Sequence, residues 1–179
     1  YDIFVDVAKK FSKINSYWKF IAIGNEPRKK IFPNKKFVKE IGYKSNVEVL
    51  NYYEKSEIAI GNSKWQEPLG RIAIEASSRK CCPIISNVGG LIESKHIGMV
   101  LEKNNTDNIL NILKKLTSNN NFLRKMQNEF YKKNDFDIRD ISKSIDHVRE
   151  QILKTDSNQN ISKLKILHIT HFNERFDGR

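Results

Sequence analysis

Two glutamates, Glu67 and Glu75, stand at the ends of the stretch EPLGRIAIE and carry the clearest potential for chemistry. A carboxylate at each place can accept hydrogen bonds from a separate set of sugar hydroxyls. Pro68 suits a first helical turn, so the sequence predicts a helix over 68–80 with Glu67 at its start. On such a helix the two carboxylates lie about 10–12 Å apart along the axis. The implied ligand is extended, with a diphosphate between two sugars.

The first turn of this predicted helix offers the backbone N–H groups of Leu69, Gly70 and Arg71. Such groups have no partner inside a helix, and they attract anions and hydroxyl oxygens. Gly70 has no side chain, so a ligand can approach the backbone closely. A purely structural interpretation stays open, because Arg71 and Glu75 form an i,i+4 pair worth about 0.3–0.5 kcal/mol on an exposed face.

The surrounding chain alternates between strand-like and helix-like patterns. Short apolar strands are expected at 18–24, 37–42, 57–63, 83–90 and 98–103. Helices are expected at 2–15, 47–56, 68–80, 107–118, 121–133 and 137–153. This alternation indicates an α/β fold, with a Rossmann-like parallel sheet and helices on both faces. Such sheets bind ligands at the carboxyl ends of their strands, which directs attention to the loops after residues 24, 42, 61 and 87.

The block EPLGRIAIEASSRKCCPIISNVGGLIES resembles the donor-binding signature of retaining GT-B glycosyltransferases of the large family 4 group. That signature contains a Glu, a Gly, a Glu-Ala pair, a Pro-led strand and a Gly-Gly turn followed by a Glu. The matching residues, in order, are Glu67, Gly70, Glu75, Ala76, Pro83, Gly89, Gly90 and Glu93. Upstream, FIAIGNEP and VKEIGY resemble earlier strands of the family. The resemblance implies the C-terminal, donor-binding lobe of a GT-B fold.

The same resemblance implies roles for individual residues. Glu75 binds the ribose hydroxyls of the nucleotide, and Glu67 holds hydroxyls of the donor sugar. Three further groups of donor-binding positions are implied. The backbone at Leu69, Gly70 and Arg71 faces the sugar and diphosphate. The loop of Ile41, Gly42 and Tyr43 lies along the base, and Gly24 leaves room near the phosphates. Arg71 departs from the aliphatic or aromatic residue common in the family. No metal or cofactor is implied, and no catalytic residue is assigned within the chain.

The expected domain organisation follows from this resemblance. The chain opens at Tyr1 rather than at Met, so we expect it to be part of a longer protein. Residues 1–153 are expected to be a donor-binding lobe without its first strand, 154–162 a polar linker, and 163–179 the first strand and loop of a following domain. The chain alone is expected to be inactive. The whole protein is expected to transfer sugar, with retention, from a nucleoside-diphosphate sugar to a glycan or glycolipid.

Composition limits the other functional classes. The 32 Lys and Arg exceed the 21 Asp and Glu, which gives a formal net charge of +11. Because the basic residues are scattered singly or in pairs, a solvated surface is favoured over nucleic-acid binding. Two alternatives remain open, namely a lobe of a sugar-nucleotide epimerase and a non-catalytic basic binding module.

The expected location is the cytoplasm. The chain has neither an apolar run long enough to span a membrane nor a recognisable secretory signal. The adjacent Cys81 and Cys82 are interpreted as small buried residues, which fits a reducing compartment. The basic surface suggests peripheral contact with anionic lipid at the inner face of the membrane.

Overall fold

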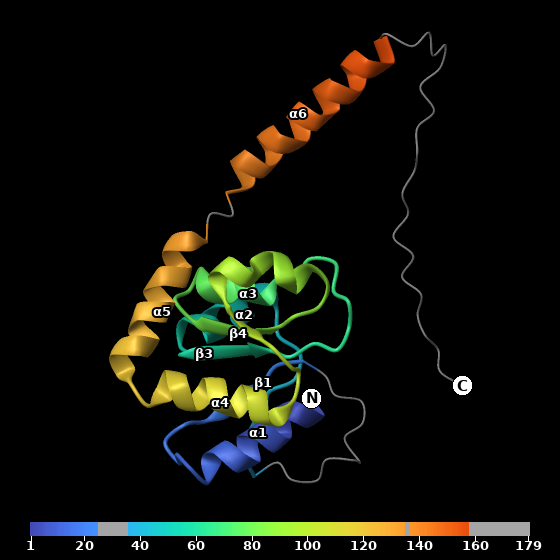
Figure 1. Cartoon of the computed structure of the whole chain (residues 1–179). Helices are drawn as coiled ribbons and strands as arrows, with labels where there is room; N and C mark the ends of the chain where they lie inside the picture. Colours follow the sequence, from blue (N-terminus) through green and yellow to red (C-terminus); the bar gives the residue numbers. More distant parts are fainter. Residues whose placement is uncertain (25–35, 135–136, 158–179) are drawn as a thin grey trace, which may run out of the picture. The chain divides into compact units, whose positions relative to one another are not determined.

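The computed structural model describes residues 1–24, 36–134 and 137–157. The chain divides into two units, Tyr1–Asp135 and Phe136–Arg179, and each is considered by itself. In the first unit all strand pairings are parallel, and helices lie on both sides of the strands (Figure 1). This arrangement confirms the α/β fold class.

The described elements of the first unit are short. The strands are β1 (Phe20–Ala22), β2 (Val38–Glu40), β3 (Ile58–Gly61), β4 (Cys82–Ser86) and β5 (Met99–Leu101). The helices are α1 (Asp2–Ser12), α2 (Asn46–Glu54), α3 (Ile72–Ser77), the 3-10 helix η1 (Gly89–Ile97), α4 (Thr106–Thr117) and α5 (Asn120–Lys133). These strands and helices lie close to the predicted ranges, except that α3 begins later than predicted and η1 was not predicted.

The strands pair in two groups rather than in the one continuous sheet that the sequence suggests. β1 pairs with β2, with Phe20 opposite Val38, and β4 pairs with β3 on one side and β5 on the other. α1 and α4 lie side by side below the strands in Figure 1, whereas α2 and α3 lie above them. Each outer strand, namely β1, β2, β3 and β5, therefore has one edge without a neighbouring strand among the described residues.

The core forms where both faces of the sheets are covered. All five residues of β4 are buried, because this strand has neighbours on both edges and helices on both faces. Cys81 and Cys82 are fully buried free thiols, which confirms their interpretation as small core residues. Burial raises the pKa of Cys82 to about 12 and also raises the pKa of Cys81 well above its ordinary value.

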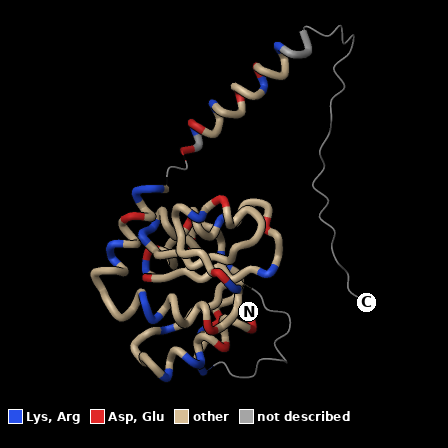
Figure 2. The backbone as a smooth tube through the Cα atoms, viewed as in Figure 1, with Lys and Arg blue, Asp and Glu red and all other residues tan. Residues whose placement is uncertain are grey.

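Charged side chains of both signs are interspersed along the chain (Figure 2). Many of them pair locally, as in Lys10–Asp6 at 3.1 Å and Lys133–Glu129 at 2.7 Å, both at i,i+4 spacing. Such pairs are typical of solvated helix surfaces. No helix of the described residues is long and apolar enough to cross a membrane.

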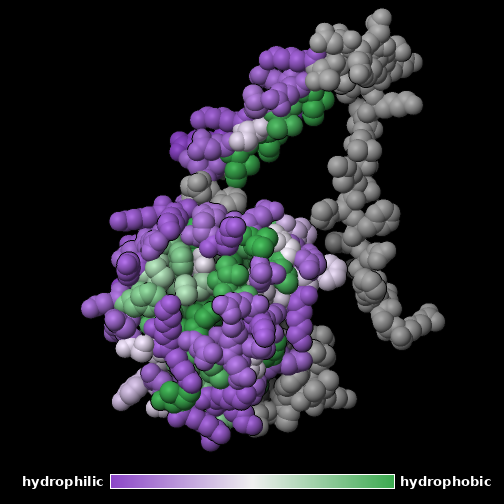
Figure 3. Space-filling view, in the orientation of Figure 1, coloured by the Kyte–Doolittle hydropathy of each residue, from purple (hydrophilic) through white to green (hydrophobic). Residues whose placement is uncertain are grey.

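The second unit contains the helix α6 (Ile138–Ser157). Its hydrophobic side chains gather on one side, with hydrophilic ones opposite (Figure 3). The apolar positions include Ile141, Ile145, Val148 and Ile152, all exposed. α6 extends through Ser157, so it includes the first residues of the segment 154–162 that we expected to be a linker. The predicted strand and loop at 163–179 lie outside the described residues.

Candidate functional site

The loops that follow β1 and β2 meet through backbone hydrogen bonds. The N–H of Gly24 donates to the carbonyl oxygen of Gly42 at 2.9 Å. Both glycines have positive φ, 116° and 69°, a conformation that L side chains rarely adopt. A Cβ on Gly24 would meet no described atom within 4 Å, so space is open beside it. Tyr43 follows directly and is 77% exposed.

Glu75 lies on α3, where two side chains orient its carboxylate. Its Oε1 accepts hydrogen bonds from the Arg71 guanidinium at 2.5 Å and from the Asn46 amide at 3.1 Å. The Glu75 side chain is only 18% exposed, whereas Arg71 is 64% exposed. The i,i+4 pair of Arg71 and Glu75 that the sequence suggested is therefore present. It leaves Oε2 of Glu75 available as an acceptor among the described residues.

Asn46 is positioned by the start of α2. Ser45 caps this helix: its hydroxyl accepts the Glu48 N–H at 3.4 Å, while the Glu48 carboxylate accepts the Ser45 N–H at 2.9 Å. This reciprocal capping box fixes the first turn. Asn46, the next residue, thus reaches Glu75 from a rigid element. Sequence reasoning missed Asn46, although the Ser-x-x-Glu pattern before it is a recognisable signal.

The helix that carries Glu75 begins later than predicted. α3 starts at Ile72 with Arg71 as its N-cap, so residues 68–70 lie outside it. The expectation that the N–H groups of Leu69, Gly70 and Arg71 form a first helical turn was wrong, and so was the helical separation of Glu67 and Glu75. Gly70 has φ +64°, which stops the helix from extending back to Pro68.

The absence of a side chain at Gly70 is required for packing against η1. The residue is buried, and a Cβ there would lie 2.5 Å from Cδ2 of Leu91 on η1. The absence of a side chain thus lets the backbone before α3 rest on η1. Leu69, beside it, is 45% exposed and remains open to solvent.

The Gly89–Gly90 turn holds the loop that carries Glu67. The Gly90 N–H donates to the Glu67 carbonyl oxygen at 2.6 Å, and the Gly89 N–H donates to the side-chain oxygen of Gln66 at 2.6 Å. A Cβ on Gly90 would lie 2.3 Å from the carbonyl oxygen of Pro68. The two backbones are thus in direct contact, which only glycine permits.

Asn104 also holds the loop between β3 and Glu67 through side-chain hydrogen bonds. The amide of Asn104, which follows β5, donates to the carbonyl oxygens of Asn62 and Ser63 at 3.2 and 2.7 Å. Sequence reasoning missed Asn104 and Gln66. Both are amide side chains in loops at the carboxyl ends of strands, and that position could have indicated their role. Trp65 projects from this loop and is 73% exposed.

The two carboxylates differ in their surroundings. Glu75 is held by Arg71 and Asn46, whereas the Glu67 carboxylate has no hydrogen bond or ion pair within the described part of the chain. Tyr53 lies near Glu75, and its pKa is raised to about 12, first by burial and then by the Glu75 charge. The described residues contain no cluster of three or more metal-binding side chains. The arrangement offers carboxylate acceptors for hydroxyl groups.

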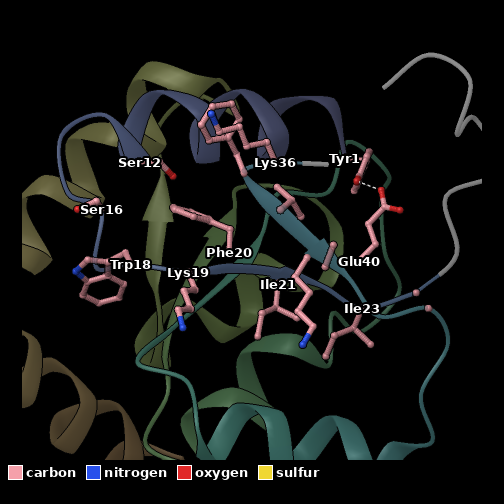
Figure 4. Close-up of a pocket in the computed structure, with 16 residues that line it drawn as sticks. Tyr1, Ser12, Ser16, Trp18, Lys19, Phe20, Ile21, Ile23, Lys36 and Glu40 are labelled. Atoms are coloured by element: carbon pink, nitrogen blue, oxygen red, sulfur yellow. Dashed lines mark hydrogen bonds between the residues drawn. The ribbon is translucent and has the colours of Figure 1, made fainter. Parts of the chain in front are cut away.

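A separate cavity of about 890 Å³ borders β1 and β2. Gly24 and Gly42 are among its lining residues, as are Phe20, Ile21 and Ile23 (Figure 4). Neither Glu67 nor Glu75 belongs to its lining, so the two carboxylates lie outside this cavity. The predicted site residues therefore form two groups, one around Gly24 and Gly42 and one around Glu67 and Glu75.

Parallel strand pairs flanked by helices, with glycine turns after the strands and acidic residues in the loop before α3 and on α3, give this unit a Rossmann-like architecture of the kind found in GT-B glycosyltransferases. Residues 1–133 match the sequence model of the family described as "Glycosyl transferases group 1". The chain belongs to this family.

Part of the chain is also similar to a curated protein. A curated Klebsiella pneumoniae protein, described as an uncharacterized 42.6 kDa protein in the cps region, is 33% identical over 94 residues. That match covers 49% of this chain and 24% of the relative. The chain thus spans about a quarter of the length of its curated relative.

Two solved structures share the fold. A glycosyltransferase from Rickettsia africae has a TM-score of 0.69 at 22% identity, over 84% of this chain and 44% of that one. HepE of Anabaena, in complex with UDP, has a TM-score of 0.69 at 14% identity, over 81% and 44%. The chain therefore corresponds to less than half of either protein.

Proposed function

We propose that this chain forms the donor-binding part of a retaining GT-B glycosyltransferase of the family 4 group, and that it binds a nucleoside-diphosphate sugar. The observation that carries the proposal is that Glu67 and Glu75 are both held in place by neighbouring residues. Arg71 and Asn46 orient Glu75, and Gly90 anchors the loop of Glu67. Membership of the group 1 family supports the same reading.

The proposed roles follow the chemistry of each position. Oε2 of Glu75 accepts hydrogen bonds from ribose hydroxyls, while Glu67 accepts them from the donor sugar. Leu69, Gly70 and Arg71 border the sugar and diphosphate.

The remaining positions serve the nucleotide. Ile41, Gly42 and Tyr43 lie along the base, and the open space at Gly24 accommodates phosphate oxygens. HepE is described in complex with UDP, which makes UDP the first nucleotide to test.

The proposed reaction is transfer of the sugar with retention to a glycan or glycolipid acceptor, bound by another part of the whole protein. Negative charge grows on the diphosphate as it leaves, so fixed positive groups and backbone dipoles stabilise the transition state. We place the reaction in the cytoplasm, with basic surface near anionic lipid of the inner membrane face. Nucleic acid is not a proposed partner, because acidic residues are interspersed among the basic ones (Figure 2).

The decisive experiment is ligand-observed NMR with a panel of nucleoside diphosphates and their sugars. The wild-type chain is compared with Glu75→Ala and with a matched control, Glu129→Ala. Glu129 is also an i,i+4-paired glutamate, but it lies on α5. We expect selective binding of one nucleotide, weakened about tenfold or more in Glu75→Ala, because hydrogen bonds to charged groups contribute about 1.5–3 kcal/mol. Glu129→Ala should bind as the wild type does.

Binding that is equal for all bases and indifferent to Glu75→Ala would contradict the proposed site. A steep loss of affinity for DNA with added salt, also indifferent to Glu75, would instead support the basic binding module. An epimerase lobe would bind the same class of ligand, so it is distinguished by product analysis on the whole protein.

A further inference from the structure

The 9–19 segment, which covers the end of α1 and the turns that lead to β1, is positively charged. Residues 7–24 contain Lys9, Lys10, Lys13 and Lys19 and no Asp or Glu. All four lysines are exposed. In Figure 2 the end of α1 that lies away from the N-terminus is blue. The nearest acidic residue before the segment, Asp6, pairs with Lys10 at 3.1 Å, so the other three lysines carry most of the free charge.

Part of this charge has a structural reason. Lys9 and Lys10 lie in the last turn of α1, and Lys13 is its C-cap. Cations at this end of a helix are stabilised by the helix dipole. α4, which lies beside α1, also ends with basic residues, Lys114 and Lys115. The dipole accounts for lysines at the helix ends, but it does not account for the hydrophobic side chains exposed among them.

Two large hydrophobic side chains project from the same segment. Tyr17 is 92% exposed, the highest value among the described large hydrophobic residues, and Ile14 is 58% exposed. Figure 3 shows hydrophobic surface among hydrophilic surface at this end of the first unit. A single exposed hydrophobic residue needs no explanation, whereas neighbouring ones rimmed by polar residues are typical of a surface that meets a partner.

The turns that present these side chains have a fixed shape. The N–H groups of Ile14 and Asn15 both donate to the Phe11 carbonyl oxygen at 2.9 Å. The side-chain oxygen of Asn15 accepts the Tyr17 N–H at 3.1 Å. The next residue, Trp18, packs its ring edge-on against the buried Phe11, with the ring centroids 6.4 Å apart. Tyr17 is therefore exposed on a backbone that is anchored on both sides of it.

The 9–19 segment lies at the opposite edge of the strands from the candidate site. α1 begins at the carboxyl edge, where the Tyr1 hydroxyl donates to the carboxylate of Glu40, the last residue of β2 (Figure 4). The helix then runs back to the amino edge, where Phe20 begins β1. The loop at Gly24 follows β1 at the carboxyl edge. A partner bound to the 9–19 segment thus leaves the loops of the candidate site uncovered.

The chemistry of the segment fits a surface of anionic phospholipid. Lysine ammonium groups are attracted to the negative charge of such a surface. Tyrosine is suited to the boundary between headgroups and acyl chains, because its ring is apolar and its hydroxyl stays in water. The aliphatic side chain of Ile14 fits the acyl layer. Nucleic acid would also attract the lysines, but it binds proteins by stacking on aromatic rings and offers nothing comparable to an exposed isoleucine.

We propose that the 9–19 segment docks this unit on anionic phospholipid, with Ile14 and Tyr17 in the interface and the lysines over the headgroups. The inference rests on the membrane contact included in the proposed function, and it names the surface that makes this contact. The nucleotide site takes no part in it. Vesicle binding and nucleotide binding are therefore separate measurements, and either can fail without the other.

The test is co-sedimentation of the full chain with vesicles of phosphatidylcholine, alone or mixed with an equal part of phosphatidylglycerol. Lys9→Gln with Lys13→Gln is compared with Lys125→Gln and Lys132→Gln, two exposed lysines of α5 that reduce the net charge equally. We expect binding only to the mixed vesicles, weakened about twentyfold in the first double variant, because each lysine near an anionic surface contributes about fivefold. The α5 variant should bind within about twofold of the wild type.

Tyr17→Ala tests the hydrophobic part of the contact. The side chain is almost fully exposed, so its removal should leave the fold unchanged, which circular dichroism checks. We expect affinity for the mixed vesicles to fall about fivefold, since an apolar ring no longer leaves water on binding. Bicelles that contain a nitroxide-labelled headgroup should broaden the amide signals of Ile14 and Tyr17 more strongly than those of Gly24 and Gly42.

Four outcomes would overturn the proposal. Absent or equal binding to the two kinds of vesicle would show that anionic lipid is not the partner. Equal losses in the two double variants would show that net charge, and not this segment, governs binding. Strongest broadening at Gly24 and Gly42 would place the contact at the candidate site. Binding of duplex DNA that Lys9→Gln with Lys13→Gln weakens, without binding to the mixed vesicles, would show that the surface serves nucleic acid.

Discussion

The backbone N–H of Gly90 donates to the carbonyl oxygen of Glu67 across 2.6 Å, which ties the turn after β4 to the loop before α3. The glycine pair therefore supports a residue on another loop, in addition to turning its own chain. Since Gly90 also lies against Pro68, the position of the Glu67 backbone depends on the missing side chain.

Gly90→Ala should destabilise the fold and displace Glu67. The added Cβ would lie 2.3 Å from a carbonyl oxygen of the backbone, which cannot move as a flexible side chain does. Overpacking of this kind costs about 1–3 kcal/mol. We expect a loss of that size in the free energy of unfolding, measured by urea denaturation, together with weaker nucleotide binding.

Gly98→Ala is the matched control. A Cβ there would meet its nearest atoms at 3.4 Å, which is tight but ordinary, and its φ of −158° is extended backbone. We expect a change well below that of Gly90→Ala. Equal losses in the two variants would show that the contact between Gly90 and Pro68 has no special effect.

Arg71→Ala should separate binding from stability. The guanidinium is 64% exposed, so its pair with Glu75 contributes little to folding, about 0–1 kcal/mol. Its removal frees the Glu75 carboxylate to rotate, so we expect weaker nucleotide binding at a nearly unchanged midpoint of unfolding. Both are measured on the same samples, by NMR titration and urea denaturation.

Asn46→Ala tests the same carboxylate from the other side. This variant leaves the charge of the site unchanged, so a loss of affinity here would reflect orientation alone. Tighter binding by Arg71→Ala would show that Arg71 competes with the ligand for Glu75, which would contradict the proposal that Arg71 orients this carboxylate.

The parts of the fold that the sequence predicted well are those that depend on local pattern. The alternation of apolar strands and amphipathic helices gave the α/β class, because β4 and its neighbours must be apolar to be buried on both faces. The start of α3 was missed because Pro68 is equally acceptable in a turn. The feature that interrupts the helix is the positive φ of Gly70, which a local sequence pattern does not predict.

The sequence predicted the acidic residues of the candidate site but not the side chains that hold them and their loops in place. Glu67 and Glu75 stood out by type and by their resemblance to a known signature. Asn46 begins α2, whereas Gln66 and Asn104 lie in two different loops, and the contacts of all three depend on how the strands pair. A single sequence does not reveal that pairing, so these amides looked like ordinary polar surface residues.

Removal of residues 136–179 should leave the first unit folded. Among the described residues, the buried hydrophobic side chains run from Val7 to Phe130, and all of these belong to Tyr1–Asp135. The described side chains of α6 are exposed from 139 to 154. We expect a chain ending at Asp135 to unfold cooperatively, with a midpoint within about 4 °C of the full chain, a shift corresponding to no more than about 1 kcal/mol.

Thermal unfolding by circular dichroism measures this midpoint, and the full chain measured in parallel is the control. A truncated chain that aggregates or lacks a cooperative transition would show that α6 supplies part of the core. That result would favour the expected lobe boundary at residue 153 over the division at 135.

Stability should fall in alkaline solution because two thiols must stay protonated in the fold. Burial raises the pKa of Cys82 from its ordinary value of 9.0 to about 12 and raises that of Cys81 as well. A raised pKa in the folded state means that the stability is complete below about pH 9 and is lost as pH rises toward the folded value. Each thiol should cost about 1.4 kcal/mol per pH unit in this window.

The measurement is urea denaturation at several pH values between 8 and about 10.5, below the range in which Tyr53 contributes strongly. The double variant Cys81→Ala with Cys82→Ala is the control, because it lacks both thiols but keeps every lysine. We expect the wild-type stability to fall more steeply than that of the variant, by about 2–3 kcal/mol for each pH unit above 9. Parallel curves for the two proteins would mean that the thiols ionise as easily in the folded state as in the unfolded chain, and hence that they are not buried in solution.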